Sequence, residues 1–172
     1  MIEVVLRAVR VDVGSATPLL LLEEVGGPRV LPIFIGAPEA TAIAYALQHI
    51  ETPRPMTHDL LFDVIRALGA DLDAVEIVDL VDNTFYATLR LRVEEREILV
   101  SARPSDAVAL ALRSRASLFV SDELMDAEAQ MIEVDEDESE DEAEEPEAPS
   151  DAELLAQLRT FLDEVKPEDF GQ

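Results

Sequence analysis

The sequence contains no cysteine, which excludes disulfide bonds, thiolate metal sites such as zinc fingers, and a cysteine nucleophile. Histidine is almost as scarce, because His49 and His58 are the only two. One chain therefore cannot supply a three-histidine metal site, and a bound metal would depend on carboxylates, which favour Mg²⁺ or Mn²⁺. The patterns GxGxxG, GxxxxGK[ST], HExxH and GxSxG are also absent, which counts against the common nucleotide-binding, zinc-protease and serine-hydrolase sites.

Long uncharged apolar runs are missing as well. No segment offers the roughly 18 consecutive apolar residues that a membrane-spanning helix requires. The first residues carry Glu3, Arg7 and Arg10 and lack the basic start and clean apolar stretch of a secretion signal. We therefore expect a cytoplasmic protein without membrane contact.

Negative charge dominates the sequence and is concentrated at one end. The formal net charge is −25, and residues 133–172 hold 17 acidic and 2 basic side chains. Such a chain repels phosphate backbones and lacks the basic footprint of a typical nucleic-acid-binding protein. Between 133 and 147 eleven of fifteen residues are Asp or Glu, which predicts a disordered acidic linker over 133–149. The folded domain is accordingly predicted to span residues 1–132.

A C-terminal amphipathic helix is predicted over 150–166. Ser150 and Glu153 have the spacing of a capping box, and apolar residues follow at helical spacing as a single stripe: Leu154, Leu155, Leu158, Phe161, Leu162 and Val165. A short one-sided helix is marginal alone in water, so we expect it to dock on its own domain or on a protein partner.

Hydrophobic periodicity and turn residues predict an alternation of strands and helices in the domain. Pro32 lacks an N–H group, so its strand is expected at a sheet edge or at a bulge. The segments between 75 and 102 form a predicted antiparallel meander, with a turn at Asp82-Asn83 between its first two strands. Predicted strands are 2–13, 17–24, 29–35, 75–81, 84–93, 97–102 and 117–120. Predicted helices are 39–48, 57–68 with Thr57 as N-cap, 107–113, and 122–128 with Ser121 as N-cap.

Two similar polar segments precede predicted helices. They are Arg54-Pro-Met-Thr-His-Asp59 and Arg103-Pro-Ser-Asp106, each with Arg-Pro before the helix and Asp in or beside the first turn. Exposed N–H groups at a helix start, helped by an arginine fork, can bind an anion. The same residues can also be simple helix caps, and the arginines can form ion pairs with the aspartates.

Single residues leave similar alternatives open. His58 is suited to proton transfer near neutral pH, but a lone histidine is also compatible with a structural role. Glu39, at the start of its predicted helix, fits a helix-dipole partner or a metal ligand.

Four motifs, in this order and spacing, resemble the bifunctional nuclease (BFN-domain) family: LPIFIGAPEATAI (31–43), RPMTHDLL (54–61), TFYATL (84–89) and SARPSDAVALALR (101–113). The resemblance covers about residues 2–130. It implies a compact single α/β (α+β) domain with three or four helices and a mixed, largely antiparallel sheet. It also implies homo-oligomers and a nuclease activity on DNA and RNA. A shared polar site would contain Glu39, Arg54, His58, Asp59, Arg103, Ser105 and Asp106.

Combining the residues with the resemblance predicts hydrolysis of phosphodiester bonds assisted by a divalent cation. Glu39, Asp59 and Asp106 would hold Mg²⁺ or Mn²⁺, and His58 would be the general base. Arg54 and Arg103 would clamp the phosphate, with Ser105 beside them. The bound metal would offset the local negative charge.

Two other functions are compatible with the same residues. One is a non-catalytic oligomeric scaffold or regulatory protein, whose polar motifs cap helices and whose C-terminal helix binds a partner. The other is a binding module for a small anionic ligand. An open pocket on which both Arg-Pro motifs converge would favour the enzyme.

Overall fold

The computed structural model describes residues 1–12 and 14–131, so the predicted linker and C-terminal helix lie outside the described residues. In this part of the chain eight strands form one sheet in the order β6-β5-β4-β7-β1-β2-β3-β8. The strands are β1 (Ile2–Val11), β2 (Pro18–Glu24), β3 (Arg29–Phe34), β4 (Ala70–Val81), β5 (Thr84–Val93), β6 (Arg96–Ala102), β7 (Ser117–Val120) and β8 (Gln130–Met131).

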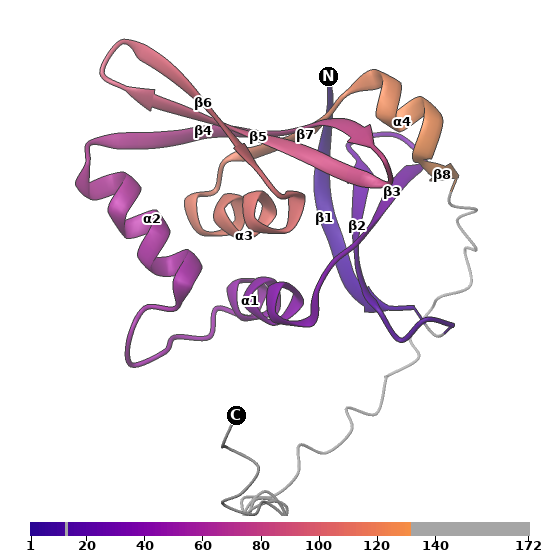
Figure 1. Ribbon diagram of the computed structural model, residues 1–172, viewed down its shortest axis with the longest axis horizontal. Coiled ribbons are helices and arrows are strands. Elements are labelled where there is room, and N and C mark those ends of the chain that lie inside the picture. Colours follow the sequence, from indigo (N-terminus) through magenta and orange to yellow (C-terminus); the bar gives the residue numbers. More distant parts are fainter. Residues whose placement is uncertain (13, 132–172) are drawn as a thin grey trace, which may run out of the picture. The chain divides into compact units, whose positions relative to one another are not determined.

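Four helices complete this part of the chain: α1 (Ala37–Leu47), α2 (Thr57–Ala67), α3 (Pro104–Ser114) and α4 (Asp122–Glu128). Helices α1, α2 and α3 lie together on one side of the sheet, and α4 lies apart from them beside β3 (Figure 1). No described helix is both long and apolar enough to cross a membrane.

The sheet is mixed and largely antiparallel, as predicted. Strands β4 and β7 are the parallel neighbours in the described sheet, with Val75 of β4 opposite Leu118 of β7. The predicted meander is present as β4, β5 and β6, and Asp82 and Asn83 both adopt positive φ in its first turn. Asn and Asp tolerate this conformation, which matches the twist of a two-residue hairpin turn.

Pro32 lies near a sheet edge, as its missing N–H group predicted. It faces Leu21 of β2 on one side, while the short β8 pairs only with Arg29 and Val30 on the other. On the side away from β2, the rest of β3 therefore has no neighbouring strand among the described residues, and a proline can face that side without the loss of a ladder hydrogen bond.

Helix α3 is the centre of the core. Its residues Ala107 to Ala111 are buried, and it packs against α1, α2 and the sheet. Small alanines allow close approach on several sides, and Leu110 is completely buried among the surrounding apolar side chains. Because α3 packs against two helices and the sheet, its first turn is held next to α1 and α2.

Several predicted boundaries were wrong. Strand β4 begins at Ala70, not at residue 75: Ala70, Leu72 and Ala74 are buried while Asp71 and Asp73 are exposed, a period-two alternation that the prediction missed. Helix α1 begins at Ala37, not at 39, because Pro38 is tolerated in a first turn.

The predicted cap at Thr57 was also wrong. Met56 is the N-cap and Thr57 is the first helical residue, and the Asp59 carboxylate accepts a hydrogen bond from the Met56 backbone N–H at 2.9 Å. The predicted Ser121 cap is confirmed, since its hydroxyl accepts a hydrogen bond from the Leu124 N–H at 3.3 Å.

The central position of α3 predicts a large cost for a cavity there. Replacing Leu110 by Ala should lower the free energy of unfolding by about 2–5 kcal/mol, the range for buried leucines. Urea unfolding of the full chain measures this. The exposed Val11 of β1 provides the control, because Val11→Ala should cost less than about 1 kcal/mol. Equal losses in the two variants would contradict the central placement of α3.

Candidate active site

The first turns of α1, α2 and α3 share one feature. Each carries an acidic residue at its third helical position: Glu39 in α1, Asp59 in α2 and Asp106 in α3. Carboxylates near a helix N-terminus interact favourably with the helix dipole. From the sequence, these three residues were predicted to form one metal site. In the folded protein, packing gives them different neighbours.

Arg103 joins two of these carboxylates. Its Nη1 lies 2.9 Å from Oε1 of Glu39, and its Nε and Nη2 donate to the two oxygens of Asp106 at 2.6 and 3.0 Å. The second contact is a two-point fork, the strongest arrangement for this pair. Arg103 is also the residue before Pro104, so it sits at the N-cap of α3 with an extended backbone.

His58 completes the group. Its Nε2 lies 3.0 Å from Oδ1 of Asp106, which places the imidazole of α2 against the first turn of α3. The His58 side chain is 11% exposed, whereas that of Arg103 is 65% exposed. We call Glu39, His58, Arg103 and Asp106 the Arg103 cluster. It brings residues of both sequence segments together, with a buried histidine side and an open arginine side.

The charge states in the Arg103 cluster follow from these contacts. Burial acts to raise the pKa of Asp106, but hydrogen bonds from Arg103 and His58 outweigh it and hold that pKa below its ordinary value. The hydrogen bonds with Asp106 in turn raise the pKa of Arg103. At neutral pH the cluster therefore contains an ionised carboxylate at Asp106 and a cation at Arg103.

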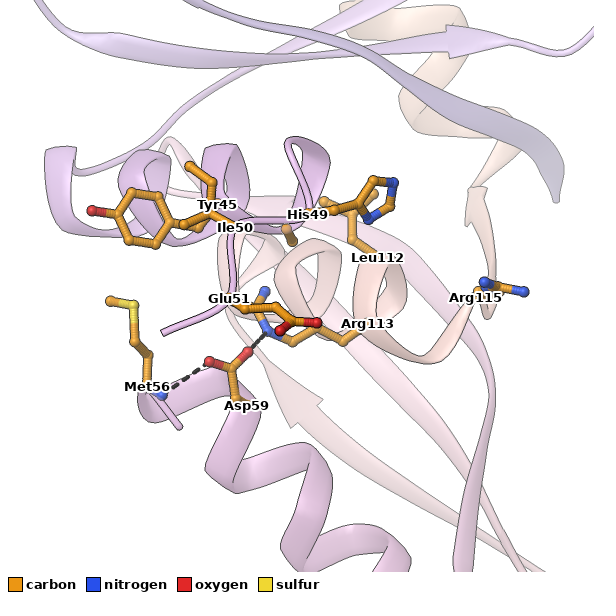
Figure 2. A pocket seen from close by; sticks show the side chains of 10 residues that line it. Tyr45, His49, Ile50, Glu51, Met56, Asp59, Leu112, Arg113 and Arg115 are labelled. Atoms are coloured by element: carbon orange, nitrogen blue, oxygen red, sulfur yellow. Dashed lines mark hydrogen bonds and ion pairs between the residues drawn. The ribbon is translucent and has the colours of Figure 1, made fainter. Parts of the chain in front are cut away.

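Asp59 belongs to a separate ion pair. Figure 2 shows its carboxylate pointing toward Arg113, whose Nε donates to Oδ1 of Asp59. The same guanidinium donates to the carbonyl oxygens of Ala109 and Ala42, at 2.9 and 3.2 Å. Burial acts to raise the pKa of Asp59, but the hydrogen bonds from Arg113 and Met56 keep it below its ordinary value. This pair ties α2 to α1 and α3.

The Arg103 cluster opens onto a pocket of about 280 Å³. Glu39, Arg103 and Ser105 line it together with residues from the end of β3 and the loop after it, from the β4–β5 turn and the start of β5, and from the start of α3: Ile33, Phe34, Ile35, Gly36, Asn83, Thr84, Phe85 and Pro104. Three of the four sequence motifs meet here. Ser105, which is itself buried, lies at the pocket wall.

A second pocket of about 270 Å³ lies beside the ion pair of Asp59 and Arg113 (Figure 2). Its wall contains Tyr45, Ala46, His49, Ile50, Glu51, Met56, Asp59, Leu112, Arg113 and Arg115. Of the residues that the sequence predicted for the polar site, Asp59 lines this pocket. The carboxylate of Asp59 is already paired with Arg113, so we place the candidate active site at the first pocket.

Arg54 does not join the Arg103 cluster. It is exposed, and within residues 1–12 and 14–131 its side chain makes no hydrogen bond or ion pair. The two Arg-Pro motifs thus converge in part, through His58 and Asp106, and not through both arginines. Sequence reasoning also missed Arg113, although an arginine following the apolar run Ala107–Leu112 is a signal for a buried cation with a dedicated partner.

Comparison with known protein families identifies the family of this chain. The sequence profile of the bifunctional nuclease domain matches residues 20–135, which include every member of the Arg103 cluster. The chain belongs to the bifunctional nuclease domain family. The resemblance carried by the four motifs is therefore confirmed.

Relatives of this bifunctional nuclease domain protein fall into two groups. Two uncharacterized proteins from two strains of Mycobacterium tuberculosis are 45% identical over 168 residues, covering 98% of this chain and 97% of theirs. Bifunctional nuclease 1 of Oryza sativa subsp. indica and bifunctional nuclease of Oryza minuta are 27% identical over 106 residues. Those matches cover 60% of this chain and 32% of the rice proteins.

The predicted metal ligands do not fit a shared cation in this bifunctional nuclease domain. Among the described residues no group of three or more His, Asp and Glu side chains is arranged to hold a metal ion. Arg103 occupies the space between Glu39 and Asp106, and Arg113 pairs with Asp59. Each of these carboxylates already has a cationic partner, so we assign no step to a metal.

The pairing of Asp59 predicts a pH-dependent stability. At pH 7, Asp59→Asn should lower the free energy of unfolding by about 1 kcal/mol, less than a fully buried pair because Asp59 is 35% exposed. The folded-state pKa of Asp59 lies below its ordinary value of 3.8, so its stabilisation is present above pH 3.8 and is lost as the pH falls through the lowered pKa. The unfolding free energies of wild type and Asp59→Asn, measured with urea, should therefore become equal in acid.

The matched control for this experiment is Asp63→Asn on the same helix. Asp63 is exposed and makes no ion pair within the described residues. Its replacement should change stability by less than about 0.5 kcal/mol at either pH. A constant difference between wild type and Asp59→Asn across the acid range would contradict the assigned ion pair.

Proposed function

We propose that the protein is a nuclease that hydrolyses phosphodiester bonds of DNA, RNA or both. Membership of the bifunctional nuclease domain family and the names of the rice relatives support this class of reaction. The observation that carries the proposal is the contact of His58 with Asp106, 3.0 Å, on a carboxylate that also holds the exposed Arg103 beside an open pocket. The cation thus lines a space of ligand size, and the base contacts the carboxylate that holds this cation.

His58 is the general base in this proposal. An ionised Asp106 accepts hydrogen bonds and donates none, so Nε2 of His58 carries the proton that faces it. The other ring nitrogen, Nδ1, is then the acceptor, and it has no protein partner among the described residues. Asp106 therefore selects the tautomer and orients the ring, in the same way that a carboxylate orients a catalytic histidine in other hydrolases.

Arg103 binds the phosphate. Its contacts to Glu39 and Asp106 use three of the five N–H groups of a guanidinium, and the side chain is 65% exposed at the pocket. The remaining donors are available to a phosphodiester in the pocket, and the hydroxyl of Ser105 adds a donor at the pocket wall. Because Arg103 is held by two carboxylates, it is positioned before substrate arrives and stabilises the charge that develops in the transition state.

The reaction balances with water as the nucleophile. Water gives a proton to Nδ1 of His58 while its oxygen forms a bond to phosphorus, and one ester P–O bond breaks. The leaving oxygen takes up a proton, and His58 returns its proton to solvent. Assistance by Mg²⁺ or Mn²⁺ stays a prediction from the sequence, and the assay below tests it with the cations and with EDTA.

Loss of His58 should abolish most of the activity. We expect His58→Asn to reduce the rate of cleavage of labelled single-stranded DNA and RNA by about 10²–10⁴-fold, the usual contribution of a general base. The assay uses purified full chain with Mg²⁺, Mn²⁺ or EDTA. His49→Asn is the control, because His49 is the other histidine and has a positive φ that asparagine tolerates. Equal rates in His58→Asn and wild type would remove the proposed base.

Absence of cleavage in this assay would also separate the nuclease from the scaffold. If wild-type protein shows no cleavage in any condition, or if both variants retain the same trace, the activity is absent or is a contaminant. Either result would favour the non-catalytic scaffold, in which the contacts of the Arg103 cluster only hold three helices together.

The fork of Arg103 predicts a further loss of activity. Arg103→Lys keeps the charge but cannot hold Asp106 at two points and contact Glu39 as well, so cleavage should slow by about 10²–10³-fold. Arg10→Lys on β1 changes an exposed arginine away from the pocket and should leave the rate unchanged. The measurement is kcat/KM for both variants beside their thermal unfolding, and an unchanged kcat/KM in a folded Arg103→Lys would exclude this role.

A further inference from the structure

Helix α2 carries the proposed base, yet little apolar packing among the described residues holds its first turn. The side chains of this helix that pack on the core are Phe62 and Ile65, which lie at its middle and toward its C-terminal end. Leu60 and Leu61, which are closer to the first turn, are 54% and 42% exposed. The segment that leads into the helix, residues 51–55, is also mostly exposed. Polar contacts therefore set the position of this first turn.

The contact of His58 with Asp106 is a weak anchor by itself. Oδ1 of Asp106 accepts from Nε2 of His58 and from Nη2 of Arg103, each at 3.0 Å. Arg103 also donates to the other oxygen of Asp106, through Nε at 2.6 Å. The hydrogen bonds of this guanidinium fork are charge-assisted, and they are stronger than the bond from a neutral imidazole. Asp106 is therefore satisfied with or without His58, and its carboxylate alone does not hold α2 in place.

Arg113 provides an anchor that is independent of Asp106. Its side chain is 10% exposed, and it contacts α1, α2 and its own helix α3. Nη1 and Nη2 donate to the carbonyl oxygens of Ala109 in α3 and Ala42 in α1, at 2.9 and 3.2 Å. Nε donates to Oδ1 of Asp59, in the first turn of α2 (Figure 2). Two backbone carbonyls thus fix the guanidinium, and Asp59 binds a cation that is already in position.

Asp59 in turn fixes the start of α2. Its Oδ2 accepts a hydrogen bond from the N–H of Met56 at 2.9 Å, while its Oδ1 accepts from Arg113. One carboxylate therefore holds both the N-cap and the third residue of the helix. His58 is the residue before Asp59, inside the turn that these bonds close. The imidazole consequently projects from a fixed backbone when it meets Asp106.

We propose that Asp59 and Arg113 are positioning residues for the base His58. The pair holds the first turn of α2 where Nε2 of His58 meets Asp106, and so keeps the ring in the tautomer whose Nδ1 can accept a proton. Neither residue of the pair touches the substrate. This inference deepens the proposed function and rests on its choice of base, but the state of the ring can be measured in the protein without any substrate.

The scarcity of histidine makes this measurement simple. With isotopically labelled histidine, the full chain gives ring-nitrogen signals from His58 and His49 alone, and His49→Asn assigns them. The chemical shifts of the two nitrogens of a ring lie far apart when one tautomer dominates, and they approach each other when two tautomers exchange. In wild type at neutral pH, His58 should show a single dominant tautomer with the proton on Nε2.

Asp59→Asn should move the two ring-nitrogen shifts of His58 toward each other and leave those of His49 unchanged. The asparagine oxygen can still accept the hydrogen bond from Met56, but the amide lacks the charge that pairs with Arg113. In the cleavage assay kcat should fall by about ten- to a hundredfold while KM changes less than about twofold, because a displaced base slows the chemical step. Asp59→Glu keeps the carboxylate at a position where a capping box accepts glutamate, so it should keep the wild-type shifts.

Two further variants of α2 separate positioning from a general loss of stability. Ile65→Val removes a methylene from the core side of the helix and should cost about as much stability as Asp59→Asn. Asp63→Asn removes an exposed carboxylate. Neither should change kcat or the shifts of His58, whereas a merely structural role of the pair predicts the same change in Ile65→Val as in Asp59→Asn.

The outcomes distinguish this proposal from the nuclease itself. Unchanged His58 shifts in Asp59→Asn, equal changes in Ile65→Val, or loss of the tautomer in Asp59→Glu as well would overturn the positioning pair, even in an active nuclease. The expected shifts in a chain that cleaves no substrate would support the placement of His58 by this pair and contradict only the nuclease.

Discussion

The guanidinium of Arg103 is the interaction on which the candidate site depends. It lies between Glu39 of α1 and Asp106 of α3, and Asp106 also contacts His58 of α2. Without this cation, two carboxylates would repel each other at the meeting point of three helix N-termini. The same contact holds Asp106 ionised and orients His58 through it. The hydrogen bonds that join the three helices are therefore the same ones that position the proposed catalytic groups. Arg103 takes part in these bonds and is still exposed on one side.

Several of the arginines in this acidic chain are paired with carboxylates. Arg113 pairs with Asp59, Arg29 with Glu24 and Arg92 with Asp71 and Asp73. These cations are placed against carboxylates, so the surface offers a phosphate backbone little general attraction. A substrate would have to be held locally, by the pocket and Arg103, and not by a broad basic surface.

Local sequence predicted much of the fold but missed some boundaries and partners. The meander, the Asp82-Asn83 turn, the Ser121 cap and the edge position of Pro32 were predicted, because each depends on residues adjacent in the chain or paired in a hairpin. The start of β4 was missed because its exposed aspartates broke the apolar run that the prediction sought. Arg113 was missed because its partner Asp59 is 54 residues away.

By itself, the sequence determined the family, the kinds of element and the residues rich in chemistry, because motif order, periodicity and turn residues are properties of the chain. It could not separate Glu39, Asp59 and Asp106, which occupy the same third position of three helices. Only the packing of α1 and α2 against α3 decided that Arg103 joins Glu39 to Asp106 and that Arg113 takes Asp59. The physical reason is distance: ion pairs form between charges a few ångströms apart, and tertiary structure sets which charges these are.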